Sequence, residues 1–265
     1  MFYPASADEL AAMIDRDLEA AGAETTAPRE APKAIVVPHA GYVYSGPVAA
    51  SAYARIIGQR DTTRRVVLLG PAHRVALAGM AVPTVDLFRT PLGDVPIDAD
   101  ARRAALAVPG VIADDLPHAP EHALEVQVPF LQRALGPATG PAGEDRWRLL
   151  PVVVGRTPAE TVAGLLDALW GGAETLIVVS TDLSHYHDHA TARRLDAATA
   201  ASIVARDVAA IGVDDACGAH PLRGLLETAR RRDLPVHLLD LRTSADTAGD
   251  PTRVVGYGAF EVLGR

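Results

Sequence analysis

Four short runs of aliphatic residues constrain the fold of this chain more than any other feature of its sequence. They are rich in Val, Leu and Ile and hold no charged residue, which is typical of strands buried on both faces of a sheet. The runs cover residues 34–37, 66–69, 149–154 and 176–179, and two later runs, 236–241 and 254–263, are more mixed. A sheet of such strands needs helices on both of its faces.

Helical signals lie between these runs. Ser6 and Thr157 each begin a capping-box pattern, with Glu three residues later and aliphatic residues at helical spacing beyond it. Asp188 can cap a long helix, and Pro221 can open another. The alternation of strands and helices predicts one α/β domain over the whole chain of 265 residues, with a mostly parallel or mixed central sheet flanked by helices.

Charge balance and cysteine content narrow the class of protein. Lys and Arg number 25 and Asp and Glu 33, so the net charge is −8 and no nucleic-acid partner is expected. No apolar run approaches the roughly 20 residues of a membrane helix. Residues 1–10 lack the basic-then-apolar order of a signal peptide. With Cys217 as its one cysteine the chain has no internal disulfide to form, which favours the cytoplasm.

Residues with reactive side chains follow three of the aliphatic runs. His39 follows the first run, His73 the second, and Asp182 and His185 the run at 176–179. Ligands of open α/β sheets bind at the carboxyl ends of the strands, so we expect these side chains to share one edge. Taken singly, each histidine is more typical of a loop residue bonded to backbone, and Asp182 of a turn. Together they predict a site.

Cys217 stands just before the helix that Pro221 opens. A lone cysteine is most often a small buried apolar residue. At a helix N-terminus its pKa is expected to fall, which favours the nucleophilic and metal-binding thiolate. Two interpretations stay open from the residues: a Cys–His nucleophile pair, or a site of two histidines and one thiolate with an open position for water or substrate.

Two histidines and two glutamates lie close together in the sequence: His118, Glu121, His122 and Glu125. Aliphatic residues follow them at helical spacing, so the segment predicts an amphipathic helix that Pro129 kinks or breaks. We expect Glu121 to lie on a solvated helix face. His122 and Glu125 stand at the helix start, where loops usually build binding sites, and are candidates for the pocket.

Five segments of the chain form a recognisable set. They are PHAGYVYSG at 38–46, LGPAH at 69–73, HALEVQVPF at 122–130, STDLSHY at 180–186 and CGAHP at 217–221. Together with FYP at 2–4 and VGYG at 255–258, they resemble the Memo family, whose prokaryotic members are called AmmeMemoRadiSam system protein B. The resemblance covers nearly the whole chain, and the motifs occur in the family's order.

The resemblance implies the fold of class III extradiol ring-cleaving dioxygenases (the LigB-like architecture), which use non-haem iron(II). It maps the family's metal ligands onto His39, His73 and Cys217, and further pocket residues onto Asp182 and His185. Iron(II) is therefore the expected cofactor, and copper or zinc are alternatives that imidazole and thiolate also accept. The dioxygenases are similar but use a carboxylate where Cys217 stands, and a thiolate changes the charge and electronics of the iron.

Three functions are compatible with these expectations. The first is a dioxygenase-like, metal-dependent oxidoreductase in which His185 is the general acid/base and Asp182 orients it or binds substrate. Contacts to a small-molecule or peptide ligand are expected from Tyr42, His122, Glu125 and His220.

The second function is a non-catalytic scaffold that binds a peptide or a partner protein. The resemblance implies association with a radical-SAM protein and the other proteins of that system, and in animals the family is linked to cell signalling and copper-dependent redox chemistry. The third function is a zinc-dependent hydrolase, in which a metal-activated water attacks a carbonyl. None of the three requires a membrane.

Overall fold

The computed structural model describes residues 2–23 and 30–264. Its strands are β1 (Pro32–Val37), β2 (Arg65–Pro71), β3 (Met80–Val82), β4 (Leu87–Thr90), β5 (Gly93–Pro96), β6 (Val111–Ala113), β7 (Arg148–Val154), β8 (Thr175–Ser180), β9 (His185–His187), β10 (Val236–Thr243) and β11 (Val254–Leu263). One sheet has the order β10-β11-β1-β8-β2-β7-β3-β6, with β9 beside β11, and β4 and β5 form a separate hairpin.

Helices alternate with these strands along the chain. They are α1 (Ala7–Ala23), α2 (Tyr42–Tyr53), α3 (Ala99–Leu106), α4 (His122–Glu125), α5 (Val128–Ala134), α6 (Ala159–Leu169), α7 (His189–Ala205), α8 (Ala219–Arg231) and α9 (Ser244–Thr247), with 3₁₀ turns η1 (Ala54–Gln59) and η2 (Val208–Ala210). In the described part of the chain, no helix is long and apolar enough to cross a membrane.

The centre of the sheet is parallel. Strands β1, β8, β2 and β7 pair in parallel, whereas β11 runs antiparallel to β1 and β3 antiparallel to β7. The four central strands contain the four aliphatic runs of the sequence. Side chains alternate between two cores: Ile35 and Val37 of β1 enter one, and Ala34 and Val36 the other. Burial on both faces explains why the four runs inside these strands are apolar at every position.

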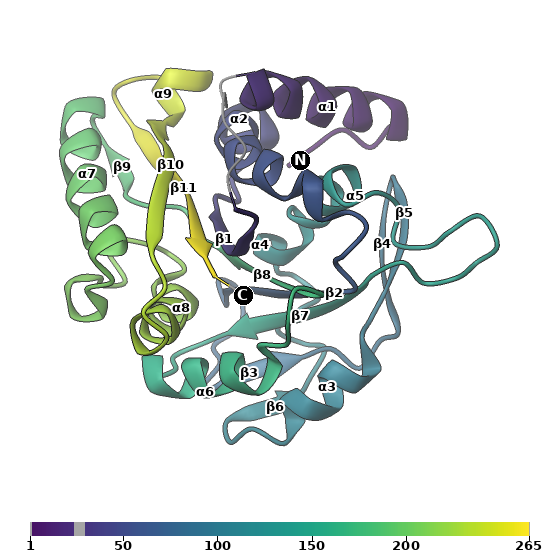
Figure 1. Cartoon of the computed structure of the whole chain (residues 1–265). Coiled ribbons are helices and arrows are strands. Elements are labelled where there is room, and N and C mark those ends of the chain that lie inside the picture. Colours follow the sequence, from purple (N-terminus) through teal and green to yellow (C-terminus); the bar gives the residue numbers. More distant parts are fainter. Residues whose placement is uncertain (1, 24–29, 265) are drawn as a thin grey trace.

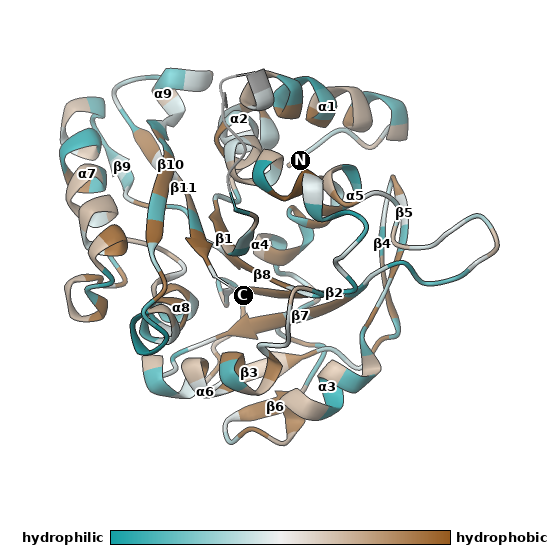
Figure 2. Cartoon of the chain, in the orientation of Figure 1, coloured by the Kyte–Doolittle hydropathy of each residue, from teal (hydrophilic) through white to brown (hydrophobic). Residues whose placement is uncertain are grey.

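Helices cover both faces of the sheet, as Figure 1 shows. Residues of α1, α2 and α5 pack into the core on one face, and residues of α3, α6, α7 and α8 into the core on the other. The hydrophobic strands run between these helices (Figure 2). The predicted α/β domain with a mixed central sheet flanked by helices is therefore confirmed.

A helix follows each of the two expected starts at Asp188 and Thr157, but only Asp188 caps its helix. The Asp188 side chain accepts a hydrogen bond from the Thr191 N–H and caps α7. Helix α6 begins after Pro158 with no side-chain cap, because the Thr157 hydroxyl donates to the carbonyl of Gly79 instead. That bond ties the loop before α6 to the loop before β3.

The helix expected after His118 is broken into α4 and α5. The break is at Val126 and Gln127, and Pro129 lies in the first turn of α5, where its missing N–H costs little. The buried Gln127 amide donates to the carbonyl of Pro38 at 2.8 Å and to the Ser180 hydroxyl at 2.8 Å. These bonds hold the break against the ends of β1 and β8.

Candidate metal centre

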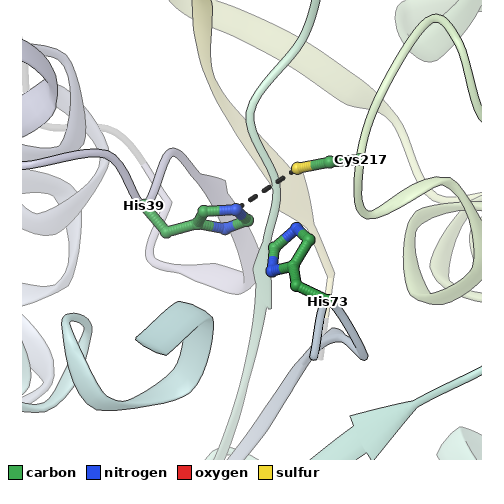
Figure 3. A group of neighbouring side chains, drawn as sticks. All are labelled: His39, His73 and Cys217. Atoms are coloured by element: carbon green, nitrogen blue, oxygen red, sulfur yellow. Dashed lines mark hydrogen bonds between the residues drawn. The ribbon is translucent and has the colours of Figure 1, made fainter. Parts of the chain in front are cut away.

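His39, His73 and Cys217 meet at the carboxyl ends of the parallel strands. His39 follows β1, His73 follows β2, and Cys217 precedes α8. Figure 3 shows the two imidazoles and the sulfur turned toward one another. The ligand atoms of the three residues all lie within 4.8 Å of one another, and His39 Nε2 is 3.2 Å from Cys217 Sγ. The expectation that three distant turns converge therefore agrees with the structure.

Each imidazole is oriented by a hydrogen bond at its other nitrogen. His39 Nδ1 lies 2.9 Å from the Ser180 hydroxyl, and His73 Nδ1 lies 2.9 Å from Glu121 Oε1. In both rings, Nε2 is therefore the nitrogen that faces the other two residues of the group. A carboxylate or hydroxyl partner that fixes the second nitrogen is the usual arrangement of metal-binding histidines.

Glu121 is a site residue that the sequence analysis missed. It was expected on a solvated helix face, but it is 6% exposed and its second oxygen accepts the His73 N–H at 2.7 Å. It also accepts the Ala123 N–H as the N-cap of α4. Burial alone would raise the pKa of Glu121, but the bonds from His73 and Ala123 outweigh it and lower the pKa to about 2. Its position just before a helix, where a side chain can cap the first turn, is the feature of the sequence that could have indicated its burial.

Cys217 is held by the backbone of the turn after β8. Its Sγ lies 3.2 Å from the Asp182 N–H, and Gly218 lets the two turns approach: a Cβ there would lie 2.7 Å from the Ser180 carbonyl oxygen. Burial raises the pKa of the Cys217 thiol to about 12, and the charge of Asp182 adds to the rise. The expected lowering by the helix N-terminus is wrong for the metal-free chain, because desolvation outweighs the helix.

Asp182 joins two of the ligand turns. Its buried carboxylate accepts the His39 N–H at 2.7 Å, while its backbone contacts Cys217. This hydrogen bond goes to the backbone of His39, and the expectation that Asp182 orients His185 or binds substrate stays a prediction. Burial raises the pKa of Asp182, and burial together with the charges of His73 and His122 keeps the pKa of His39 well below its usual value. His39 is thus neutral, the form that ligates metal.

His122 and His185 lie beside the cluster. The His122 ring is 5.2 Å from the His73 ring and 5.5 Å from the His39 ring, and Phe2 stacks on it at 4.3 Å. His122 also joins His73 and Glu121 in a second group of close ligand atoms. His185 begins β9, is half-buried, and interacts electrostatically with the carboxylate of Asp182.

The other expected substrate contacts lie outside the donor group. The Tyr42 hydroxyl is buried and donates to the Val126 carbonyl at 2.6 Å. Glu125 is exposed and accepts a hydrogen bond from the Tyr3 hydroxyl. His220, on α8, pairs its Nδ1 with the Thr157 carbonyl at 3.1 Å.

The three donors fit a transition-metal ion. Two donors at about 2.0–2.3 Å from one ion lie roughly 3–4 Å apart, and the 3.2 Å between His39 and Cys217 falls in this range. Two imidazoles and a sulfur suit iron, copper or zinc. The His73 side chain is 27% exposed, so the group is open to solvent on that side. Three protein ligands with an open side are typical of a reactive metal site.

Comparisons with known proteins agree over the whole length of the chain. The family described as "Memo-like protein" matches residues 1–261. A MEMO1 family protein of Methanopyrus kandleri is 34% identical, covering 98% of this chain and 95% of the relative. A MEMO1 family protein of Aquifex aeolicus is 33% identical, covering 97% and 94%.

One solved structure is similar at a lower level. It is titled as an uncharacterized protein, JW3007, from Escherichia coli K12, with a TM-score of 0.48 and 14% identity over 85% of this chain and 98% of that one. The family match and the two relatives span nearly all of the sequence, including the turns that carry His39, His73 and Cys217. The chain belongs to the family of Memo-like proteins.

Proposed function

We propose that this protein binds one redox-active metal ion, iron(II) in the first place and copper as the alternative, between His39, His73 and Cys217. The observation that carries the proposal is the convergence of two imidazole Nε2 atoms and one sulfur, with both Nδ1 atoms already engaged. A bound iron or copper ion would supply one-electron chemistry toward dioxygen or an organic substrate at the open position.

The residues of the chain have separate tasks in this proposal. Glu121 and Ser180 hold the two imidazoles in one tautomer, and Asp182 holds the turn of His39. His185 is the group placed to give or take a proton beside the bound ligand, because it is half-buried and close enough to Asp182 for the two side chains to interact electrostatically. His122 forms the neighbouring wall.

Metal content and affinity test the proposal. The wild type is purified without oxygen, its metal content is measured, and the stripped protein is titrated with Fe(II), Cu(I) and Zn(II). We expect one ion per chain, and in Cys217→Ala a loss of affinity of more than about 100-fold, because a ligand contributes more than the outer-shell groups that orient it. Cobalt(II) substitution reports the sulfur directly, through a thiolate-to-metal absorption band that Cys217→Ala lacks.

His220→Ala is the matched control. His220 lies three residues from Cys217 but bonds to the Thr157 carbonyl, so its removal is expected to leave metal affinity unchanged. A wild type that binds no metal, or a Cys217→Ala variant that binds as tightly, would overturn the site. Binding of zinc with no affinity for iron or copper would overturn the redox part and favour the hydrolase alternative.

A further inference from the structure

Tyr186 has a backbone conformation that its side chain disfavours. Among the described residues, three non-glycine residues have a positive φ: Tyr186 (66°), Arg206 (58°) and Asp233 (53°). Arg206 caps the end of α7, and Asp233 follows the end of α8, where a left-handed residue is ordinary. Tyr186 ends no helix. It is the middle residue of β9, between His185 and His187.

The conformation presents an aromatic ring to solvent beside the candidate metal centre. The Tyr186 side chain is 63% exposed, and its ring centroid is 5.6 Å from that of His185. An exposed tyrosine adds little to the stability of a fold, and a left-handed one opposes it. Backbone strain of this kind collects at functional sites, where the surrounding structure holds it in place.

The strand pairing around Tyr186 holds it in place. β9 pairs with β11 at His185–Val255 and His187–Val254, with an irregularity of the register between the two pairs. The Gly256 N–H donates to the Ser184 carbonyl at 2.8 Å, just before β9. The ring therefore projects from a backbone that is fixed on both sides.

Arg253 lies against this ring. Its guanidinium carbon is 4.4 Å from the ring centroid of Tyr186. Most of the arginines that the structure describes have a carboxylate partner; Arg55, for example, is paired with Glu261. Within residues 2–23 and 30–264, no ion pair or hydrogen bond of the Arg253 side chain is found, so its positive charge and its donors face solvent.

We infer that Tyr186 and Arg253 recognise the ligand of the candidate metal centre, and that this ligand is a small molecule with a planar group and an anionic group. The anionic group, a carboxylate or a phosphate, pairs with the guanidinium, and the planar group packs on the tyrosine ring. The inference rests on the proposed function, because it takes the cluster beside His185 as the place where the ligand reacts.

The test uses the full chain, both metal-free and loaded with zinc, titrated by calorimetry with three simple probes. Benzoate and phenyl phosphate carry the two anionic groups, and benzamide is the neutral counterpart of benzoate. We expect the wild type to bind at least one of the two anions and to bind benzamide at least tenfold more weakly. The tighter of the two anions identifies the group that the natural ligand carries.

Variants separate the two contacts. Arg253→Gln and Tyr186→Gly are each expected to lower the affinity for the better anion at least tenfold, with and without zinc, and Tyr186→Phe to restore most of the binding that glycine loses. Because glycine accepts a positive φ, Tyr186→Gly is expected to melt no lower than the wild type. Arg146→Gln, an exposed arginine next to β7, is the control and is expected to bind like the wild type.

Anion affinity that is the same in Arg253→Gln as in the wild type, or equal binding of benzamide, would overturn the inference. Failure of the proposed function is a different result, namely no metal bound by the wild type. In that case the metal-free titrations still decide whether Arg253 and Tyr186 bind the anion.

Discussion

The two ends of β1 each carry a buried, basic side chain, and the two are satisfied differently. At the start of the strand, Lys33 donates to the carbonyls of Trp170, Gly172 and Thr175 at 2.5–2.7 Å, so all three ammonium hydrogens are used. Past the other end, His39 has one nitrogen on a hydroxyl and the other facing a sulfur.

Desolvation acts on both ends of the strand. Burial lowers the pKa of Lys33 to about 8 and raises the pKa of Cys217 to about 12. The difference lies in the hydrogen-bond partners. Lys33 has an acceptor for each of its three hydrogens, whereas the ligand atoms of His39 and its neighbours point at a common centre. A buried group whose hydrogen-bond partners all come from the protein has a structural role. Donor atoms that converge without such partners indicate a site for a bound ligand.

Among the substitutions that keep all three ligands, Glu121→Gln is expected to have the largest effect. The amide has one acceptor oxygen where the carboxylate has two, so it loses one of the two bonds that hold His73. We expect metal affinity to fall about 10–100-fold, or about 1.4–2.7 kcal/mol, as for other outer-shell partners of ligating histidines. Titration of the stripped protein with cobalt(II) measures it.

Asp98→Asn is the control for Glu121→Gln at the opposite end of the strands. Asp98 is also a buried helix cap: it accepts from the Ala101 N–H, and it pairs with Arg65 at 2.7 Å. This variant is expected to lose stability and keep its metal affinity. If Glu121→Gln binds cobalt(II) as tightly as the wild type, the carboxylate does not orient His73 for a metal.

Substitution of Lys33 by Met tests the structural role of the side chain at the start of β1. It leaves three carbonyls near the end of α6 without their donor, and we expect a loss of about 2 kcal/mol in the free energy of unfolding. Urea unfolding at neutral pH measures the loss, and metal affinity is expected to stay the same.

The pH dependence of that loss has a defined sign. The pKa of Lys33 is about 8 in the fold, below its ordinary value of 10.5, so between these values the unfolded chain holds more protons. Stability contributed by Lys33 therefore rises with pH in this window, and the gap between wild type and Lys33→Met should widen from pH 8 to pH 10. Equal stability of the two proteins at both pH values would show that the carbonyls find other donors.

Much of the fold is encoded locally. The runs at 34–37 and 176–179 are apolar throughout because both faces of β1 and β8 are covered, and that pattern is visible without a structure. The strands β3 and β6 have only three residues each and were not predicted. They exist because β3 pairs with both β7 and β6, and such long-range pairing leaves no periodic pattern in a short segment.

The candidate metal ligands could be predicted from the sequence, but the residues that orient them were harder to predict. His39, His73 and Cys217 stand at the ends of strands or before a helix, where residue type and position together indicate a site. Glu121 was assigned to solvent because its partner, His73, is 48 residues away in the sequence. The raised pKa of Cys217 was missed because the helix N-terminus is visible in the sequence, whereas the desolvation of the turn is not.

The last test of the comparison is the reactivity of Cys217 toward an alkylating reagent. With a pKa of about 12, the metal-free thiol holds far less thiolate at pH 8 than an ordinary thiol with a pKa of 9.0, although the greater nucleophilicity of that thiolate offsets part of the difference. We expect iodoacetamide to react with the stripped protein at least about tenfold more slowly than with N-acetylcysteine, with mass spectrometry as the measurement.

The pH profile of this alkylation decides whether desolvation governs both ends of the strand. A thiol with an ordinary pKa reaches its full rate soon after pH 9, whereas the rate of Cys217 should keep climbing about tenfold per unit through pH 10, because its thiolate fraction is still small there. Cobalt(II) should suppress the reaction, since the ion takes the sulfur as a ligand. A rate that levels off near pH 9 in the stripped protein would mean that Cys217 is solvated like a surface thiol. His39 would then face an ordinary side chain, and the contrast with Lys33 would no longer identify a metal site.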